Sequence, residues 1–466
     1  MQTTRTIRNT FVPVNRLPPE ILSRILEYRA RERDLVVATQ VCWYWRSTLV
    51  SRPSLWTCFQ FQKGSRHDID RTLTYLERSK SAPIDVSIEN NWERHLDVLE
   101  HLAPHIARTR SLVIRTRNDT HTVSLLFCDP APLLQHLEFC NTSEVVGNIP
   151  DNFLGQRAPS LRSVNFVHIC PTFESIFPLP NLTEFHLSLG RATPFRVGAL
   201  FRFLSESPLL QKIQINVHNR SVQDVSLDKV ISLESLVELD CGCNRTGQII
   251  PFLRLPRLKR LRVTSLGPRQ AQTLADVLPH GGRALLTGVT KMFYDSGPHA
   301  HSHRVELSGN GVDISFHAFG PVGNATLVDW SPDQTWIPFG QIEDLRFERG
   351  PSIDHPIDVS AFENLRILRV VLWDEEPTKG LFRLLHPGPG ASGVPCRSLQ
   401  EIEAKDVPWG SQGPLPRFLV SLVRARKRAG YQLRLVSLVV GCRGPHWDLL
   451  EELGEYVWGV RVRAWM

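Results

Sequence analysis

One short phrase of alternating apolar and polar residues recurs along most of the chain. It has the form L-x-x-L-x-L, in which other apolar residues can replace leucine. Because side chains along a β-strand alternate between its two faces, the phrase predicts a short strand with one buried face. The first six copies follow one another at intervals of about 21 to 28 residues. The copies begin at Leu134, Leu161, Leu182, Leu210, Leu236, Leu258, Ile342, Leu365 and Leu399.

The interval between copies is typical of a stack of structural repeats. A single unit cannot bury its apolar face, whereas neighbouring units in a stack cover one another. The phrases resemble irregular leucine-rich repeats that lack the usual asparagine after the strand. The resemblance implies a solenoid of parallel strands, and the missing asparagine ladder predicts imperfect curvature. The alternative is a set of unrelated amphipathic strands in an ordinary α/β domain.

The segment before the repeats has a helical pattern instead. Residues 17–20, Leu-Pro-Pro-Glu, suit a helix start, since the first turn has unbonded N–H groups and favours an acidic side chain. Ile21, Leu22 and Ile25 then fall on one helix face. A second apolar set follows over residues 35–56. So short a segment cannot bury all of these side chains by itself, so part of its apolar surface is expected to contact a partner.

Four sub-motifs in this segment, in this order, resemble an F-box. They are Leu17-Pro18-x-Glu20-Ile21-Leu22, Asp34-Leu35, Val41-Cys42-x-x-Trp45-Arg46 and Pro53-x-Leu55-Trp56. The resemblance implies a three-helix module that binds a Skp-family adaptor. It further implies a set of residues that contact the adaptor or hold the helices together, namely Leu17, Pro18, Ile21, Leu22, Ile25, Val41, Cys42 and Trp45. The alternative is a helical hairpin whose leucine and tryptophan residues form a private core.

One stretch departs from the F-box pattern. The family has a further apolar residue and a proline-containing turn after the first helix, whereas this chain has Arg-Ala-Arg-Glu-Arg at residues 29–33. The first helix is therefore expected to run on, which would weaken adaptor binding.

These patterns predict an α/β fold class, with an N-terminal three-helix F-box-like module followed by an irregular leucine-rich-repeat-like solenoid with parallel strands. They also divide the chain into segments. In chain order these are a flexible leader (residues 1–13), the F-box-like module (14–61), a connecting segment (62–100), a repeat array (101–268), an insertion with a hairpin and loops (269–340), and resumed repeats with a C-terminal cap (341–466).

Further elements are predicted outside the repeat phrases. Gly, Pro and Asn punctuation and local periodicity mark their ends. Helices are predicted over residues 71–80, 269–278 and 417–429, and strands over 83–88 and 433–440. A β-hairpin is predicted over 304–316, a loose Gly/Pro-rich joint over 380–395, and a final amphipathic segment over 447–458 that caps the last repeat.

Composition narrows the class of protein. Of the 466 residues, 42% are hydrophobic and 22% charged, which is typical of a soluble globular protein. No apolar run approaches the length of a membrane span, and the first residues lack the apolar core of a signal peptide. Nine scattered cysteines indicate reduced thiols, which predicts a cytoplasmic and/or nuclear protein.

The net charge of +7 raises the question of nucleic acid. The 54 basic and 47 acidic residues are interleaved, and no basic tract has aromatic residues between its charges. The sequence therefore favours a protein partner and predicts neither a membrane nor a nucleic-acid partner.

Catalytic motifs are missing from the sequence. It has no Gly-rich phosphate loop, nucleophile elbow, Cys-x-x-Cys pair or His-Glu-x-x-His motif. The cysteines of Cys241-Gly242-Cys243 are too close in sequence for a usual zinc pair, and Cys241 falls on an inward strand position. The alternating histidines at residues 299–303 have no acidic companion. We therefore expect no catalytic residue, no metal and no cofactor.

The F-box resemblance implies a function when it is combined with the repeats. One end of the chain would bind the Skp-family adaptor, and through it the cullin and RING subunits, while the repeats would bind a protein client. The chain would then be the non-catalytic substrate-recognition subunit of a Skp–cullin–F-box ubiquitin ligase. The alternatives are an adaptor-binding scaffold not coupled to ubiquitination, and a repeat-fold protein that binds nucleic acid or another ligand.

Strand parity locates a candidate client surface. In each repeat strand the residues between the inward ones point to the opposite face, which is the concave face of a solenoid. The hypothesis is a mixed-charge band on this face, with the segment 280–340 lying over it. The alternative is a solvated face whose charges only keep the protein soluble. The residues of the band are His186, Lys212, Glu238, Asp240, Arg260, Arg262, Arg346 and Arg369.

Overall fold

The computed structural model shows a mixed α/β chain that folds as two compact units, residues 1–226 and 227–466. Each unit is described by itself. The described residues are 12–29, 32–61, 68–89, 95–117, 127–142, 147–149, 152–171, 179–190, 197–217, 229–242, 249–266, 278–295, 302–319, 337–348, 359–371, 375–387, 393–405, 414–440 and 447–464.

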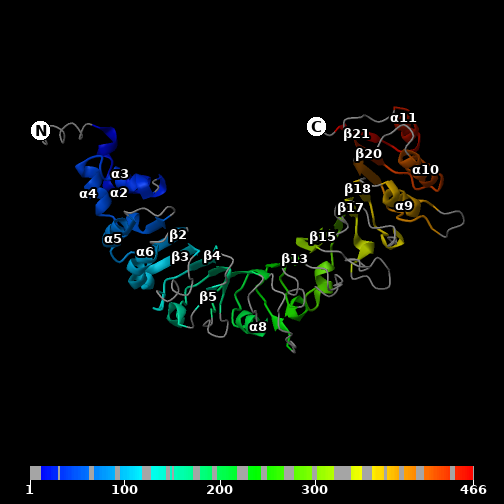
Figure 1. The fold of residues 1–466 in the computed structure, drawn as a ribbon. Helices are drawn as coiled ribbons and strands as arrows, with labels where there is room; N and C mark the ends of the chain where they lie inside the picture. Colours follow the sequence, from blue (N-terminus) through cyan, green and yellow to red (C-terminus); the bar gives the residue numbers. More distant parts are fainter. Residues whose placement is uncertain are drawn as a thin grey trace. The chain divides into compact units, whose positions relative to one another are not determined.

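The first unit begins with a small helical region, which Figure 1 shows ahead of β2 (Ile84–Glu89). Its elements are η1 (Pro13–Arg16), α2 (Pro19–Arg29), α3 (Glu32–Ala38), α4 (Trp43–Val50) and η2 (Pro53–Trp56). This agrees with the three helices implied by the F-box resemblance. Residues 30 and 31, between α2 and α3, lie outside the described part of the chain, so the expected continuation of the first helix is not tested.

Buried side chains hold the helical region to the elements that follow. Trp56 is fully buried, and its indole N–H donates to the carbonyl of Leu49 at 2.9 Å. The Trp56 ring also meets Tyr75 of α5 (Asp68–Ser79) edge-on, with centroids 5.0 Å apart. Two polar contacts join α2 to η2 and its flank, from Arg52 to Glu20 at 3.2 Å and from the Ser54 hydroxyl to Glu27 at 2.8 Å.

A parallel sheet forms the rest of the first unit. Its strands pair in the order β1, β2, β3, β4, β6, β8 and β9. The strands are β1 (Cys58–Phe61), β2 (Ile84–Glu89), β3 (Thr109–Thr116), β4 (His136–Asn141), β6 (Ser163–Val167), β8 (Glu184–Leu189) and β9 (Lys212–Val217). The other elements are α5 (Asp68–Ser79), α6 (His95–Leu102), η3 (Ala103–Arg108), η4 (Phe153–Gln156), α8 (Val197–Ser205) and the short pair β5 (Gly147–Asn148) and β7 (Ile169–Cys170).

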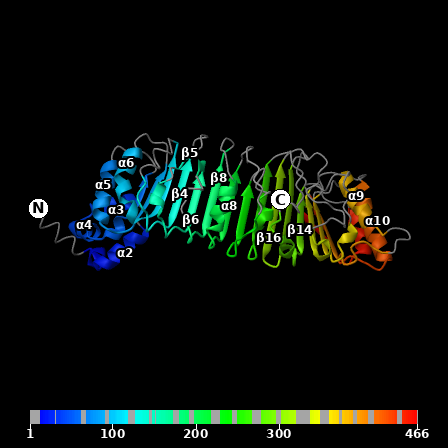
Figure 2. The same cartoon turned by 90° about the horizontal axis from the view of Figure 1, so that it is seen from below.

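The repeat phrases become neighbouring strands in register. Figure 2 shows β4, β6 and β8 side by side. Their first inward residues, Leu137, Val164 and Phe185, are partners across the sheet, and each is at most 2% exposed. Because a row of inward side chains covers the next row, the stack buries a continuous core. The predicted strands of the phrases in this unit are confirmed, as are, to within a few residues, the helix at 71–80 and the strand at 83–88.

The second unit also contains a sheet rich in parallel strands. Its strands pair in the order β11, β13, β16, β15, β14, β17, β18, β19, β20 and β21. They are β11 (Glu238–Gly242), β13 (Arg260–Leu266), β14 (Lys291–Asp295), β15 (Ser302–Gly309), β16 (Val312–Phe319), β17 (Asp344–Glu348), β18 (Ile367–Val371), β19 (Glu401–Lys405), β20 (Leu435–Val440) and β21 (Val460–Ala464).

Shorter strands and helices complete the second unit. They are β10 (Ile231–Ser232) and its partner β12 (Leu253–Arg254), η6 (Ile250–Phe252), η8 (Gly282–Leu286), η9 (Phe339–Gln341), η10 (Val359–Ala361), α9 (Glu375–Leu385), α10 (Pro414–Arg428) and α11 (Trp447–Tyr456). The helix predicted at 417–429 and the strand at 433–440 are thereby confirmed to within a few residues, and the amphipathic segment predicted at 447–458 contains α11.

The predicted hairpin is present, but its position differs from the expectation. β15 and β16 are antiparallel and turn at Asn310 and Gly311, which both have positive φ. β16 pairs with β13, while β15 pairs with β14, which in turn pairs with β17. β14, β15 and β16 are therefore members of the sheet and do not lie over its face. The helix predicted at 269–278 falls almost entirely outside the described residues.

Two further differences concern the C-terminal part. Gly380 lies inside α9, which ends at Leu385, so the loose joint predicted over 380–395 is wrong for residues 380–385. The stack also continues beyond the predicted cap, because β21 follows α11 and pairs in parallel with β20. The patterns above do not predict β21, although Val460 and Val462 alternate with Arg461 and Arg463.

Candidate functional site

The helical region at residues 13–56 exposes several large apolar side chains. Ile21 and Ile25 lie one turn apart on α2, so they share a face, and they are 44% and 45% exposed. Val41 and Trp43, just before and at the start of α4, are 56% and 78% exposed. An exposed tryptophan and several branched aliphatic residues on so small a region are typical of a protein-binding surface. We call this set the exposed apolar set, and it comprises Val14, Ile21, Ile25, Val37, Val41 and Trp43.

The residues that the sequence nominated for adaptor binding divide into two groups. Pro18, Ile21, Ile25 and Val41 are exposed and can contact a partner directly. Leu22 is only 1% exposed and belongs to the core of the region.

Three nominated residues are half-buried and organise the helices. The Leu17 carbonyl accepts a hydrogen bond from the Tyr44 hydroxyl. The Trp45 indole N–H donates to the Asn15 side chain at 2.7 Å. Cys42 occupies the N-cap position of α4. Trp43 was not nominated, although it lies between Cys42 and Trp45 in the same sub-motif.

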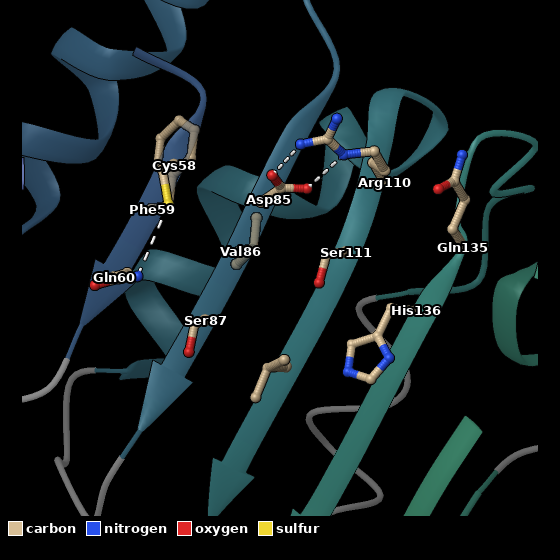
Figure 3. A pocket seen from close by; sticks show the side chains of 11 residues that line it. Cys58, Phe59, Gln60, Asp85, Val86, Ser87, Arg110, Ser111, Gln135 and His136 are labelled. Carbon is tan, nitrogen blue, oxygen red and sulfur yellow. Dashed lines mark hydrogen bonds and ion pairs between the residues drawn. The ribbon is translucent and has the colours of Figure 1, made fainter. Parts of the chain in front are cut away.

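A pocket with a volume of about 400 Å³ lies on the outward face of the sheet in the first unit. Figure 3 shows side chains from β1, β2, β3 and β4 around it. Cys58 and Gln60 come from β1, and Asp85 and Ser87 from β2. Arg110 on β3 donates from Nε to the Asp85 carboxylate at 3.0 Å, and its Nη2 contacts the second carboxylate oxygen. The hydrogen bond to Asp85 is the main cause of the raised pKa of Arg110.

Sequence reasoning did not find this pocket, because β1 and β2 precede the repeat phrases. The alternation at residues 84–88 nevertheless held a signal, since it places Asp85 and Ser87 on the face opposite Ile84 and Val86. The lining combines hydrogen-bonding side chains around one ion pair with apolar ones such as Val113.

Two nominated client residues lie on the sheet of the first unit. His186 on β8 is half-buried and Lys212 on β9 is exposed. The register pairs Lys212 with Glu184 and His186 with Gln214, so the two nominated residues are diagonal neighbours.

The other six nominated residues lie on the sheet of the second unit. Glu238 and Asp240 on β11 are opposite Arg260 and Arg262 on β13. The Arg260 Nη1 is 2.6 Å from the Glu238 carboxylate, and the Arg262 Nη1 is 3.7 Å from that of Asp240. The structure therefore brings together the acidic and basic pairs that strand parity placed on one face.

Arg346 and Arg369 lie further along the same face. Arg346 is ion-paired with Glu348. Arg369 contacts Asp344 at 2.5 Å and Glu403 at 3.2 Å. Burial by itself lowers the pKa of Arg369, but the hydrogen bonds to the two carboxylates outweigh burial and leave this pKa raised.

Within the described ranges, no group of three or more His, Cys, Asp or Glu side chains is placed to hold a metal ion. Cys241 is 3% exposed in the inward row, in line with the packing role predicted for it, while Cys243 and the histidines at 299 and 301 fall outside those ranges. None of the helices described above is long and apolar enough to cross a membrane.

The helical region resembles a known domain family. Residues 14–62 match the F-box-like family model. The match spans η1 to β1 and includes the whole exposed apolar set. F-box domains generally bind Skp-family adaptors, so this F-box-like domain indicates a role in adaptor binding. No curated protein matches the chain.

Proposed function

We propose that the chain is the substrate-recognition subunit of a Skp–cullin–F-box ubiquitin ligase. The F-box-like domain binds the Skp-family adaptor, and the adaptor links the chain to the cullin and RING subunits. The observation that carries this proposal is the exposed apolar set on the F-box-like domain. Burying a side chain such as isoleucine stabilises a protein by about 1.5–3 kcal/mol. Several such side chains exposed together therefore indicate a surface that a partner covers.

The sheet-forming remainder of the chain acts as a leucine-rich-repeat-like solenoid that holds a protein client. Support comes from the parallel pairing of the repeat strands and from their continuous inward rows. The outward face offers charged and hydrogen-bonding side chains to a client, including the nominated pairs on β11 and β13 and the pocket of the first unit.

The chain performs no chemistry in this proposal. It raises the local concentration of client lysines near the ubiquitin-charged enzyme that the RING subunit recruits. A cytoplasmic or nuclear location follows from this role.

A binding measurement with purified full-length chain tests the adaptor step. The Ile21→Asp/Ile25→Asp variant places charge on the exposed face of α2 and should weaken the adaptor complex by more than about tenfold. Leu73→Asp is the matched control, because Leu73 on α5 is 46% exposed but lies outside the F-box-like match. Adaptor binding that is the same in wild type and in the double variant, or absent in wild type, would contradict the proposal. Binding of adaptor without cullin would favour a scaffold.

A further inference from the structure

A second pocket, with a volume of about 340 Å³, lies on the outward face of the sheet in the second unit. Four of its lining side chains are cationic and one is acidic. They come from four strands and are Arg346 on β17, Arg369 on β18, Glu403 and Lys405 on β19, and Arg463 on β21. Strand parity had drawn attention to two of the four cations but not to Lys405 or Arg463.

The strand register explains how these cations converge. Arg346, Arg369 and Glu403 are partners in one row across β17, β18 and β19. Two residues further along the strands, Lys405 and Arg463 flank Val439 in the next row. Alternate residues of a strand share a face, so both rows point into the same pocket.

The cations of the first row form ion pairs with carboxylates of the chain itself. Arg369 is held by Asp344 and Glu403, and Arg346 is held by Glu348, so the first row is largely neutralised within the chain. In the part of the chain that the structure describes, Arg463 has no carboxylate within ion-pair distance, and its side chain is exposed. Among the described residues, the pocket cation without an ion-pair partner is therefore Arg463, on the β21 side.

The floor between these cations is apolar. Val371 and Val439 point to the pocket but are only 8% and 7% exposed, because longer side chains surround them. An apolar floor excludes water and so strengthens the attraction between a bound anion and the neighbouring cations.

We propose that this pocket binds carboxylate side chains of an acidic, partly apolar peptide segment. Arg and Lys recognise carboxylates through charge-assisted hydrogen bonds, and Arg369 already does so with two carboxylates of this chain. Glu403 disfavours a phosphate dianion through like-charge repulsion more than it disfavours a single carboxylate. Among the lining side chains that the structure describes, none is aromatic and could stack on a base, which argues against nucleic acid. That the segment belongs to a ubiquitination client rests on the proposed function; the binding itself does not.

Fluorescently labelled peptides test this proposal with the full-length chain. The probes are an alternating Glu/Val octapeptide, its Gln/Val counterpart, and a phosphoserine/Val peptide of the same length. The test variant is Lys405→Glu/Arg463→Glu. The control is Arg417→Glu/Arg428→Glu, which changes the net charge equally at two exposed positions of α10, outside the pocket.

The Glu/Val peptide should bind wild type and the control, and about tenfold or more weakly to the pocket variant. Its affinity should fall as salt is added, since the attraction is between charges. Equal binding of the Glu/Val and Gln/Val peptides, equal loss in the control, or selective binding of the phosphoserine peptide would each overturn the proposal. Circular dichroism of the variant confirms that it is folded. Because no adaptor is present, this outcome is separate from that of the adaptor experiment.

Discussion

Arg260 on β13 lies directly opposite Glu238 on β11, with its Nη1 2.6 Å from the carboxylate oxygen. Both side chains remain accessible, at 55% and 33% exposure. An ion pair exposed to this degree stabilises a fold by at most about 1 kcal/mol. The pair can therefore exchange its internal contact for a contact with a partner at little cost in stability. The same reasoning applies to Arg262 and Asp240, which lie two residues further along the same strands.

Reversing both arginines tests this face as a client surface. Arg260→Glu/Arg262→Glu places like charges opposite each other and should abolish client capture by tagged chain, while adaptor binding is unchanged. Quantitative mass spectrometry of captured proteins measures the first quantity and a pull-down the second.

A charge-swapped variant separates recognition from pairing. Adding Glu238→Arg and Asp240→Arg restores both ion pairs with reversed polarity. Client capture should stay lost in this fourfold variant. Recovery would mean that only the internal pairs matter, and an unchanged set of clients in the double variant would remove this face from the client site.

Trp56 couples the F-box-like domain to the helix α5 that follows it. Trp56→Ala should lower the free energy of unfolding by about 3–5 kcal/mol, because it leaves a cavity beside Tyr75 and removes the hydrogen bond to Leu49. Trp56→Phe keeps most of the packing and should cost less. Urea denaturation followed by circular dichroism measures both. A loss below about 1 kcal/mol in the alanine variant would show that the two regions are not coupled through this residue.

The hairpin turn offers two glycines with different surroundings. At Gly309, with φ +155°, an added Cβ would lie 2.4 Å from the carbonyl oxygen of Gly288 and 2.7 Å from the amide nitrogen of Thr290. At Gly311, with φ +77°, it would meet nothing within 4 Å. Gly311→Ala should therefore cost only the strain of a left-handed residue, about 1–2 kcal/mol, and Gly309→Ala clearly more.

Thermal or urea unfolding of the two single variants gives this comparison. Equal losses would mean that the backbone around Gly288 moves away from the new methyl group, and that the contact between β15 and the turn before β14 is not tight.

His317 on β16 makes stability depend on pH. Burial lowers its pKa below the usual 6.5, and the charges of Arg304 and Arg262 lower it further, while Glu306 and Asp295 act in the opposite direction. The unfolded chain thus binds a proton at this residue more readily than the folded chain. Stability at this site is therefore full above about pH 6.5 and falls as the pH drops towards the folded pKa.

The His317→Gln variant should lose this part of the pH dependence. The difference in unfolding free energy between about pH 7 and pH 5 should be smaller in the variant than in wild type. His105→Gln is a comparison variant, because burial and then Arg108 lower the pKa of His105 in the other unit. A difference that His317→Gln leaves unchanged would place the pH dependence elsewhere.

Local patterns predicted much of this fold. Alternation at period two identified each strand that contains a repeat phrase, and the same parity placed Arg260 and Glu238 on the outward face. The helix-start signals at residues 17–20 and the sub-motifs that follow predicted the helical region which matches the F-box-like family model. Such features depend on contacts between near neighbours, so they can be read from the sequence.

Tertiary structure decided which apolar residues are buried and which strands meet. Leu22 and Ile21 are adjacent and similarly apolar, yet only Leu22 packs inside, because the other helices cover just one side of α2. The pairing of β13 with β16 joins residues about 50 positions apart, and it turned an expected insertion into part of the sheet. The Asp85–Arg110 pocket and the cluster around Lys405 and Arg463 likewise depend on register between separate strands. Which strands pair depends on how well the whole stack buries its apolar side chains, and a local sequence pattern carries no information about that.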